Sequence, residues 1–416
     1  MNDNHSDYEL NYRPRRLAAL LRQAVEDHPV VILTGARQVG KSTLLRHEKP
    51  FSTWRYVTLD DFDVLRQAGQ DPAALWAGVD RVVLDEVQKS PSLLSAVKQA
   101  VDRRRQAVRF VLSGSANLLL MQNVGETLAG RAVYFTLFPM TLGELRGRLG
   151  PDLLLAAFRG TLPAERTIDA GESPVSHMLR GFMPALATLS GPAAVLRWWE
   201  GYVATYLERD LRSLSQIDSL SDFRRVMEAL ALRSGQMLNQ TEVSRDTGIS
   251  QPTVHRYLNL LEASHLAVRL PALARNRTKR LIKTPKLYWA DPGLASYLAG
   301  HHQAGELAAS REVGGIFETL VFLHLQVVVQ TWLPRPRLFY WRTTTGNEVD
   351  FVIEQGRKLL AVEVKLSATP HYADAEGLRA FCEDYPEAVG GLLIHAGQEV
   401  KRLGEKIVAV PWQLLG

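Results

Sequence analysis

The sequence has a single cysteine, Cys382, among its 416 residues. One thiol excludes an internal disulfide and any thiolate cluster for zinc or iron–sulfur binding. No apolar run approaches the roughly 20 residues that a transmembrane helix needs, and the first residues, MNDNHSDYEL, lack the composition of a signal peptide. Low-complexity tracts and internal repeats are also missing. We therefore expect a cytoplasmic protein that has no membrane partner.

The sequence does contain enough apolar residues for more than one hydrophobic core. These residues make up 46% of the chain, and charged residues make up 22%. Because single cores rarely serve more than about 250 to 300 residues, this length predicts two or three globular domains. The formal net charge of +5 is a mild excess that permits an anionic partner.

The segment VVILTGARQVGKSTLL predicts a phosphate-binding loop. It reads as an apolar strand from Val30 to Leu33, a glycine loop, and a helix that begins near Lys41, which matches GxxxxGK[ST] in its required context. Phosphate binding needs successive backbone N–H groups that point at the anion, and glycines leave those groups unscreened. Lys41 would supply charge to the β and γ phosphates, and Ser42 a hydroxyl to Mg²⁺. The predicted nucleotide-binding residues are Gly35, Ala36, Arg37, Gln38, Val39, Gly40, Lys41, Ser42, Thr43 and Asp85.

A second element, RVVLDEVQKSP, supports the same function. It predicts a buried strand from Val82 to Leu84 that ends in two carboxylates. Asp85 would hold Mg²⁺ through its water shell, and Glu86 would position the attacking water. Together with the glycine loop, this arrangement predicts an ATPase that uses ATP and Mg²⁺.

A third strand, RFVLSGSAN, ends in small polar groups. Ser113 or Ser115 could touch the γ-phosphate or the nucleophilic water. Alternating strands and helices predict an α/β domain with a parallel sheet that binds its ligand at the carboxyl ends of the strands. Arg131, one helix length further on, could act as an arginine finger across a subunit boundary or form a salt bridge at a helix end.

Five segments together resemble one family. GARQVGKSTLL, LDEVQKSP, LSGSANLLL, ETLAGRAVYFTLFPMTLGEL and GYVATYLERDL are similar to bacterial and archaeal AAA+ ATPases of the AAA_14 type with a C-terminal DUF4143 domain. The resemblance implies an AAA+ core, a helical lid, a winged-helix segment, a C-terminal fold similar to restriction endonucleases, and a homo-oligomeric ring, often hexameric. The expected domains are residues 1–145, 146–221, 222–300 and 301–416. The GGFP-like turn of the lid is RGFMP here, so no arginine in it is assigned to the nucleotide.

The segment LNQTEVSRDTGISQPTVHRYLNLLEASHLAVRL predicts a helix-turn-helix. Gly248 permits the tight turn and Ser250 caps the second helix, while Val254, Tyr257, Leu258 and Leu261 would pack that helix down. The outward residues of the second helix would meet DNA in the major groove; they are Gln251, Thr253, His255 and Arg256. Packing beside the ATPase without DNA is the alternative.

A basic stretch without acidic residues follows, from Arg269 to Lys286. It would form the wing, and its cations would neutralise DNA phosphates and make binding depend on salt. The DNA-binding candidates in it are Arg275, Arg277, Lys279 and Arg280.

The C-terminal strands carry a pattern that resembles PD-(D/E)xK nucleases. Asp350 lies in one strand, Glu363 and Lys365 share a face of the next, and Glu318 precedes them in a helix. In such nucleases two carboxylates bind magnesium, and the lysine steadies phosphate charge or activates water. Cleavage, a structural salt bridge, and DNA binding without cleavage all remain open, because a fold does not fix a function.

These observations predict an AAA+ motor that couples ATP turnover to the remodelling of DNA. Two alternatives from other classes are an ATP-regulated, magnesium-dependent DNA nuclease and an ATP-dependent switch or scaffold for a protein partner. Binding and cleavage assays with DNA would separate the three.

Overall fold

The computed structural model describes residues 12–103, 107–115, 128–169, 171–210, 217, 219–275 and 283–416. Arg277, Lys279 and Arg280 lie outside these residues. The chain divides into two compact units. Unit 1 comprises Met1–Met140, Glu144–Leu149 and Ala263–His265, and unit 2 comprises the remainder. Among the helices of the described ranges, none combines the length and apolar character needed to cross a bilayer.

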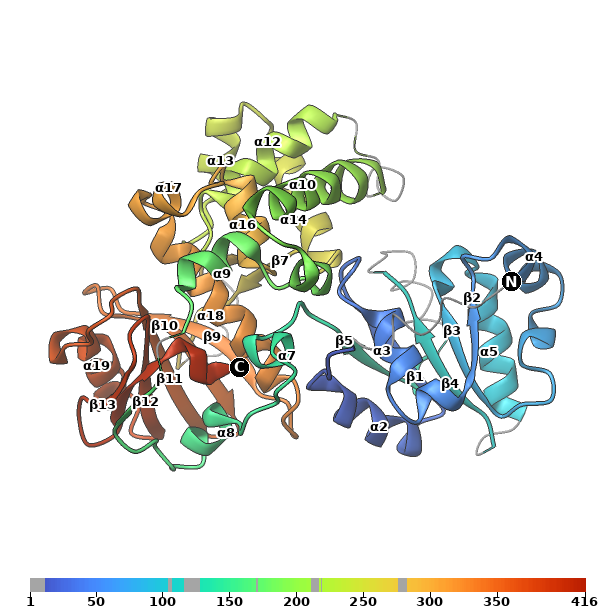
Figure 1. Ribbon diagram of the computed structural model, residues 1–416, viewed down its shortest axis with the longest axis horizontal. Coiled ribbons are helices and arrows are strands. Elements are labelled where there is room, and N and C mark those ends of the chain that lie inside the picture. Colours follow the sequence, from blue (N-terminus) through green and yellow to red (C-terminus); the bar gives the residue numbers. More distant parts are fainter. Residues whose placement is uncertain are drawn as a thin grey trace. The chain divides into compact units, whose positions relative to one another are not determined.

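Unit 1 is built on a five-stranded parallel sheet with the order β2-β3-β4-β1-β5. The strands are β1 (Val30–Thr34), β2 (Arg55–Thr58), β3 (Arg81–Asp85), β4 (Arg109–Ser113) and β5 (Ala132–Thr136). The helices are α2 (Leu17–Asp27), α3 (Lys41–His47), α4 (Phe62–Gln70) and α5 (Ser92–Arg103) (Figure 1). Strand β1 lies between β4 and β5 and is buried along its whole length, which explains its run of apolar residues.

The order of the strands brings the sequence motifs of unit 1 to one edge of the sheet. Strand β1 pairs with β4 so that Leu33 lies opposite Ser113, and β3 pairs with β4 and with β2. All these pairs are parallel, so the carboxyl ends of the strands share one edge. The glycine loop, Asp85 and Ser113 therefore lie along the same edge, as the sequence predicted.

Unit 2 includes Thr141–Gly143, and from Gly150 onward it continues through a largely helical middle. Its helices before the first hairpin are α8 (Leu153–Phe158), α9 (Pro174–Arg180), α10 (Pro192–Tyr202) with a π-helical continuation (Val203–Asp210), α12 (Leu220–Ala231), α13 (Gln240–Thr247) and α14 (Gln251–Ala263). The last residue of α14 is grouped with unit 1. Strands β7 (Ala267–Leu270) and β8 (Lys286–Trp289) then form an antiparallel pair. Three helices followed by a hairpin are compatible with a winged helix-turn-helix, which stays a prediction.

The second half of unit 2 is a mixed sheet with helices. Helices α16 (Pro292–Leu298), α17 (Ala304–Ala309) and α18 (Val313–Val329) precede β9 (Arg337–Arg342), β10 (Glu348–Gln355), β11 (Lys358–Lys365), α19 (Glu376–Asp384), β12 (Ala388–His395), β13 (Glu399–Arg402) and β14 (Ile407–Pro411). Together with β6 (Arg166–Thr167), these strands form a sheet in the order β6-β13-β14-β12-β11-β10-β9. Helix α19 packs on it through Leu378 and Phe381 (Figure 1).

Part of the segment predicted as a helical lid belongs to this sheet. Strand β6 (Arg166–Thr167) pairs with β13, and Asp152 at the start of α8 accepts a hydrogen bond of 2.6 Å from Nε1 of Trp332. The sequence did not indicate this pairing, because β6 has only two residues and its partner lies more than 200 positions later. The domain boundaries predicted within unit 2 stay predictions.

The RGFMP turn is a packing element inside unit 2. Phe182 and Met183 are fully buried, and the backbone N–H of Phe182 donates 2.8 Å to Asp291, the residue that caps α16. Gly181 has φ +83°, and a Cβ there would lie 2.4 Å from Oδ1 of Asp291 and 2.7 Å from the ring of Trp199. Only glycine fits this approach. The RGFMP turn, which differs from the family's GGFP-like turn, thus packs into the core of unit 2.

Candidate functional site

The glycine loop of unit 1 has the backbone of an anion cradle. Gln38 and Gly40 both have positive φ, at 64° and 94°. Such residues turn successive N–H groups toward one concavity. Gly35 is required for a different reason: a Cβ there would lie 2.3 Å from the carbonyl oxygen of Leu137. The backbone of the loop therefore packs directly against the backbone at Leu137 of the same unit. This contact restricts the conformation of the loop.

Lys41 is the buried cation of this loop. It is 5% exposed, and Nζ donates hydrogen bonds of 3.1 and 3.0 Å to the carbonyl oxygens of Gly35 and Ala36. Burial lowers the pKa of Lys41 to about 8, against the opposite effect of Glu86 and Asp85. An arriving phosphate would replace the two carbonyl acceptors with charged oxygens, which form stronger hydrogen bonds with an ammonium group.

The two carboxylates at the end of β3 have different surroundings. Asp85 is 2% exposed and accepts hydrogen bonds from the hydroxyl of Tyr56 and, at 3.1 Å, from the N–H of Glu86. Glu86 has φ 58°, a strained value for a side-chain-bearing residue. The amide of Gln88 donates to Glu86 and, at 3.2 Å, to Oγ of Ser115. The Asp85 carboxylate is thus held in one orientation, and Glu86 is turned out of the strand direction.

Ser113 lies at the same carboxyl edge of the sheet, and its side chain is an unsatisfied polar group. It is fully buried, and within the described part of the chain its Oγ has no hydrogen-bond partner. Buried hydroxyls without a partner are uncommon and point to a water, ion or ligand. Together with the hydroxyl of Ser42, which is half-buried, and the carboxylate of Asp85, these oxygens suit Mg²⁺ and a phosphate. The residues present therefore fit magnesium–ATP.

The sequence did not reveal the roles of Tyr56 and Arg46 at this site. Tyr56 holds Asp85, and the guanidinium carbon of Arg46 lies 4.4 Å above the centre of the Tyr56 ring. Burial and the carboxylate of Asp85 raise the pKa of Tyr56, so the phenol stays a donor. Gln88 was visible in the DEVQ motif, but Tyr56 had no local signal, because strands β2 and β3 become neighbours only in the folded sheet.

Arg131 forms a salt bridge, one of the two roles that the sequence left open. Its Nε and Nη2 donate 2.6 and 3.1 Å to the carboxylate of Asp102 at the end of α5. Arg131 immediately precedes β5, so it lies at the amino edge of the parallel sheet, and the glycine loop lies at the carboxyl edge. It cannot act on the site of its own unit from there. A role across a subunit boundary stays a prediction.

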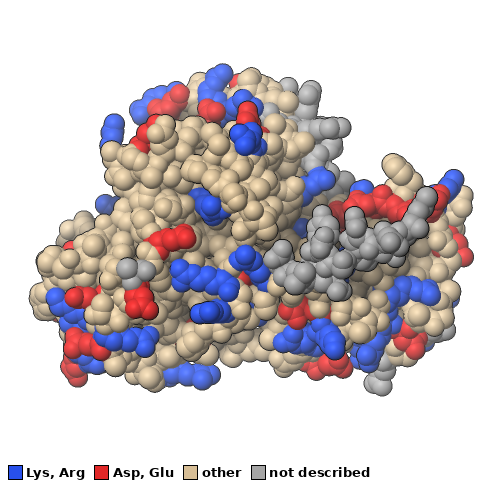
Figure 2. All heavy atoms as spheres, in the orientation of Figure 1, with Lys and Arg blue, Asp and Glu red and all other residues tan. Residues whose placement is uncertain are grey.

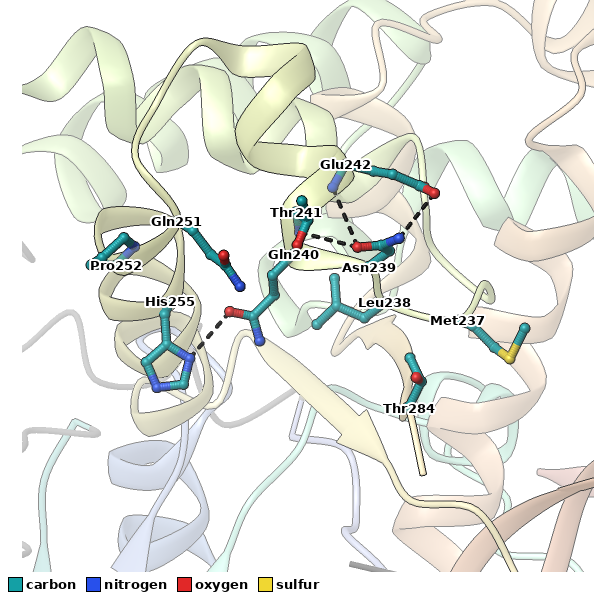
Figure 3. Close-up of a pocket in the computed structure, with 10 residues that line it drawn as sticks. All are labelled: Met237, Leu238, Asn239, Gln240, Thr241, Glu242, Gln251, Pro252, His255 and Thr284. Atoms are coloured by element: carbon teal, nitrogen blue, oxygen red, sulfur yellow. Dashed lines mark hydrogen bonds between the residues drawn. The ribbon is translucent and has the colours of Figure 1, made fainter. Parts of the chain in front are cut away.

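The recognition-helix candidates of unit 2 lie on an exposed face. Gln251, His255 and Arg256 are exposed and Thr253 is half-buried, whereas the apolar residues of α14 are buried. Gln251 and His255 line a groove of about 880 Å³ beside the start of α13 (Figure 3). The ring of His255 contacts the amide oxygen of Gln240 at 3.2 Å. Arg275, from the predicted wing, instead donates to the carbonyl oxygen of Asp384.

The C-terminal constellation is assembled, with residues that the sequence did not reveal. Asp350 accepts 3.0 Å from the N–H of Val364, and Lys365 donates 2.7 Å to Glu363. Glu318 accepts 3.0 Å from the hydroxyl of Tyr288. Lys286 lies among these carboxylates, with Nζ 3.0 Å from Asp350 and 3.5 Å from Glu318. The sequence places Lys286 in the predicted wing, because nothing local links β8 to a strand 64 positions later.

Three family models match the chain. They are an AAA domain over residues 27–146, a domain of unknown function (DUF8612) over residues 172–304, and a second one (DUF4143) over residues 313–415. Curated relatives are the uncharacterized proteins Rv2008c of Mycobacterium tuberculosis and Mb2031c of Mycobacterium bovis. Each is 30% identical over 399 residues, which cover 95% of this chain and 83% of the relative.

The chain belongs to the AAA-domain family that carries DUF4143. Its core is thus AAA+ ATPase-like, as the sequence motifs indicated.

This AAA-DUF4143 chain also has similarity to solved structures. A Thermotoga maritima RuvB Holliday junction branch migration motor has 16% identity and a TM-score of 0.28, with coverage of 66% of this chain and 91% of the motor. Caenorhabditis elegans PCH-2 has 14% identity and a TM-score of 0.24, with coverage of 64% and 69%. Structural similarity at these TM-scores does not indicate a function.

Proposed function

We propose that this AAA-DUF4143 chain is a magnesium-dependent ATPase that couples nucleotide turnover to the remodelling of DNA. One observation carries the ATPase part: the anion cradle, the buried Lys41 and the carboxylates Asp85 and Glu86 lie along one edge of the parallel sheet of unit 1. Parallel sheets bind ligands at this edge. Nucleotide binding and hydrolysis both need these groups together.

The residues of this edge divide the work of hydrolysis. N–H groups of the loop and Lys41 would grip the β and γ phosphates and stabilise the charge that builds up on them. Ser42 and Asp85 would hold Mg²⁺, which when bound neutralises phosphate charge. Glu86 would orient a water toward the γ-phosphorus and accept its proton, and Gln88 holds the Glu86 carboxylate in place. The unpartnered hydroxyl of Ser113 could donate to that water or to a phosphate oxygen.

The test of this part is nucleotide affinity. Lys41→Ala should lose binding of a fluorescent ATP analogue in the presence of magnesium, because each charge-assisted hydrogen bond is worth about 1.5–3 kcal/mol. Lys49→Ala is the matched control, since Lys49 is an exposed lysine of the same unit. Equal affinity of the two variants and the unmodified protein would refute the assignment of the loop.

The DNA part of the proposal is supported by the groove beside α14. Its lining includes amide, hydroxyl and imidazole groups of Asn239, Gln240, Gln251, His255 and Thr284 (Figure 3). These are residue types that read base edges. On the face shown in Figure 2, basic and acidic side chains are interspersed between uncharged areas. The proposal therefore places specificity on α14 and not on a broad basic field.

DNA binding is tested with labelled single-stranded, duplex and branched DNA at several salt concentrations. Joint replacement of Gln251 and His255 by alanine should weaken binding about tenfold, since one good base contact is worth roughly 1–3 kcal/mol. Gln398→Ala, at an exposed glutamine elsewhere in unit 2, is the control. DNA binding that the Gln251 and His255 replacement leaves unchanged would refute the assignment to α14. ATP turnover that DNA does not affect, together with no salt-sensitive affinity for DNA, would favour the protein-partner alternative. The proposal also includes a homo-oligomeric ring, in which Arg131 of one subunit completes the ATPase site of the neighbouring subunit.

A further inference from the structure

A buried lysine occupies the centre of the nuclease-like carboxylates. Lys286 is the first residue of β8 and is 4% exposed. Its Nζ lies 2.6 Å from Glu348, 3.0 Å from Asp350 and 3.5 Å from Glu318. We call these four residues the Lys286 chamber. An ammonium group has three N–H donors and no acceptor, so three carboxylate oxygens match its hydrogen-bonding capacity.

The electrostatics of the chamber favour a permanent cation. Burial alone would lower the pKa of Lys286, but the carboxylates of Asp350, Glu318 and Glu348 outweigh burial and raise it. The ring of Tyr340 adds to this, because its centre lies 5.8 Å from Nζ, within the range of a cation–π contact. Lys286 therefore stays charged over the whole physiological range of pH.

Both carboxylates that the nuclease pattern assigns to magnesium are already engaged. Asp350 uses one oxygen for Lys286 and the other for the N–H of Val364. Glu363 uses one oxygen for Lys365. The second oxygen of Glu363 is the exception, because it is buried and has no partner among the described residues. Within those residues, no set of three or more His, Cys, Asp or Glu side chains is placed to hold a metal ion.

Backbone packing around β8 fixes where the side chain of Lys286 starts. Gly235 donates 2.7 Å to the carbonyl oxygen of Leu287 in β8, and a Cβ at Gly235 would lie 2.8 Å from Cα of Gly315 in α18. Nearby, the hydroxyls of Ser234 and Thr319 hydrogen-bond at 2.8 Å. Strand β8 is thus held directly against the helix that carries Glu318.

We propose that Lys286 is the resident cation of this chamber and excludes a catalytic divalent ion from it. The fold that the pattern implies would hold magnesium between Asp350 and Glu363, and the residues present do not fit that group. A tethered ammonium group needs no binding from solution, and its charge repels a second cation. The chamber instead joins β8 to α18 and β10. The DUF4143 segment then does not cut DNA by metal-dependent chemistry, whatever the ATPase unit does.

The test counts Mn²⁺ ions on the nucleotide-free 416-residue chain by electron paramagnetic resonance. Three proteins are compared: the unmodified chain, Glu363→Gln and Lys286→Met. Glutamine keeps the shape of Glu363, which does not touch Lys286, and methionine keeps the aliphatic stem of Lys286 without its charge. We expect equal Mn²⁺ counts for the unmodified chain and Glu363→Gln, and one additional ion in Lys286→Met.

Two outcomes would overturn the proposal. One is an ion on the unmodified chain that Glu363→Gln removes, because the site would then hold metal despite Lys286. The other is a folded Lys286→Met protein that gains no ion, because the lysine would not stand where a metal can bind. If Lys286→Met does not fold, the first comparison decides alone, and equal counts there, together with identical melting in EDTA and in Mn²⁺, uphold the proposal.

Discussion

The replacement of Gly181 by alanine tests whether the RGFMP turn is a packing element of unit 2 or a contact for nucleotide. Gly181 has φ +83° and ψ −174°, a region that is essentially restricted to glycine and costs other residues about 1–3 kcal/mol. The new Cβ would also lie 2.4 Å from Asp291 and 2.7 Å from Trp199, which are 0% and 1% exposed. Overpacking of this kind adds about 1–3 kcal/mol.

Gly191 offers a matched control for this prediction. It has φ 79° and ψ 157°, and a Cβ there would meet nothing within 4 Å. Gly191→Ala should therefore be destabilised only by the strained backbone conformation. Gly181→Ala should be less stable than Gly191→Ala by about 1–3 kcal/mol. The backbone penalty is shared, so the difference isolates the contacts with Asp291 and Trp199.

The assay is urea denaturation read by pulsed hydrogen exchange and mass spectrometry. Peptides from α16 report on unit 2 alone, which matters because a chain with two units need not unfold in one step. ATP affinity should be unchanged in both variants. Equal midpoints for the two glycine variants, or a loss of ATP affinity in Gly181→Ala without a change in the α16 midpoint, would refute the packing account.

Two further predictions concern pH and the salt bridge of unit 1. Burial raises the pKa of Asp291 to about 6 from 3.8, so its contribution to stability is present below about pH 4 and is lost as pH rises through 6. The free energy of unfolding of unit 2 should fall by roughly 3 kcal/mol over that range, and Asp291→Asn should reduce this slope; an unchanged slope would contradict the assignment. Arg131→Ala should abolish ATP turnover if Arg131 serves a neighbouring subunit. If it forms only the exposed salt bridge with Asp102, turnover should persist and stability should change by about 0–1 kcal/mol.

The nucleotide site could be predicted because its signals are local. The glycine loop lies within eight positions, Asp85 and Glu86 follow an apolar strand directly, and the parallel order of the strands brings them together. The same reasoning located Asp350, Glu363 and Lys365, since these residues lie on two consecutive strands of a hairpin.

What the sequence could not reveal depends on contacts between distant segments. Lys286 reaches Asp350 only because β8 packs on α18, and its position in a basic stretch suggested a solvent-exposed wing instead. Tyr56 reaches Asp85 only because β2 lies beside β3. No periodicity or motif encodes either contact. Both contacts bear on the proposed chemistry: the first places an ammonium group among the carboxylates of the nuclease-like pattern, and the second orients the carboxylate that is proposed to hold Mg²⁺.

The central claim is that Glu86 positions the water that attacks ATP at the edge of unit 1. The most direct measurement is ATP affinity and steady-state phosphate release, with magnesium, for Glu86→Gln, for Glu26→Gln at an exposed glutamate of the same unit, and for the unmodified protein. We predict that all three bind ATP with similar affinity and that only Glu86→Gln fails to release phosphate. Normal phosphate release by Glu86→Gln, or no ATP binding by the unmodified protein, would contradict the account.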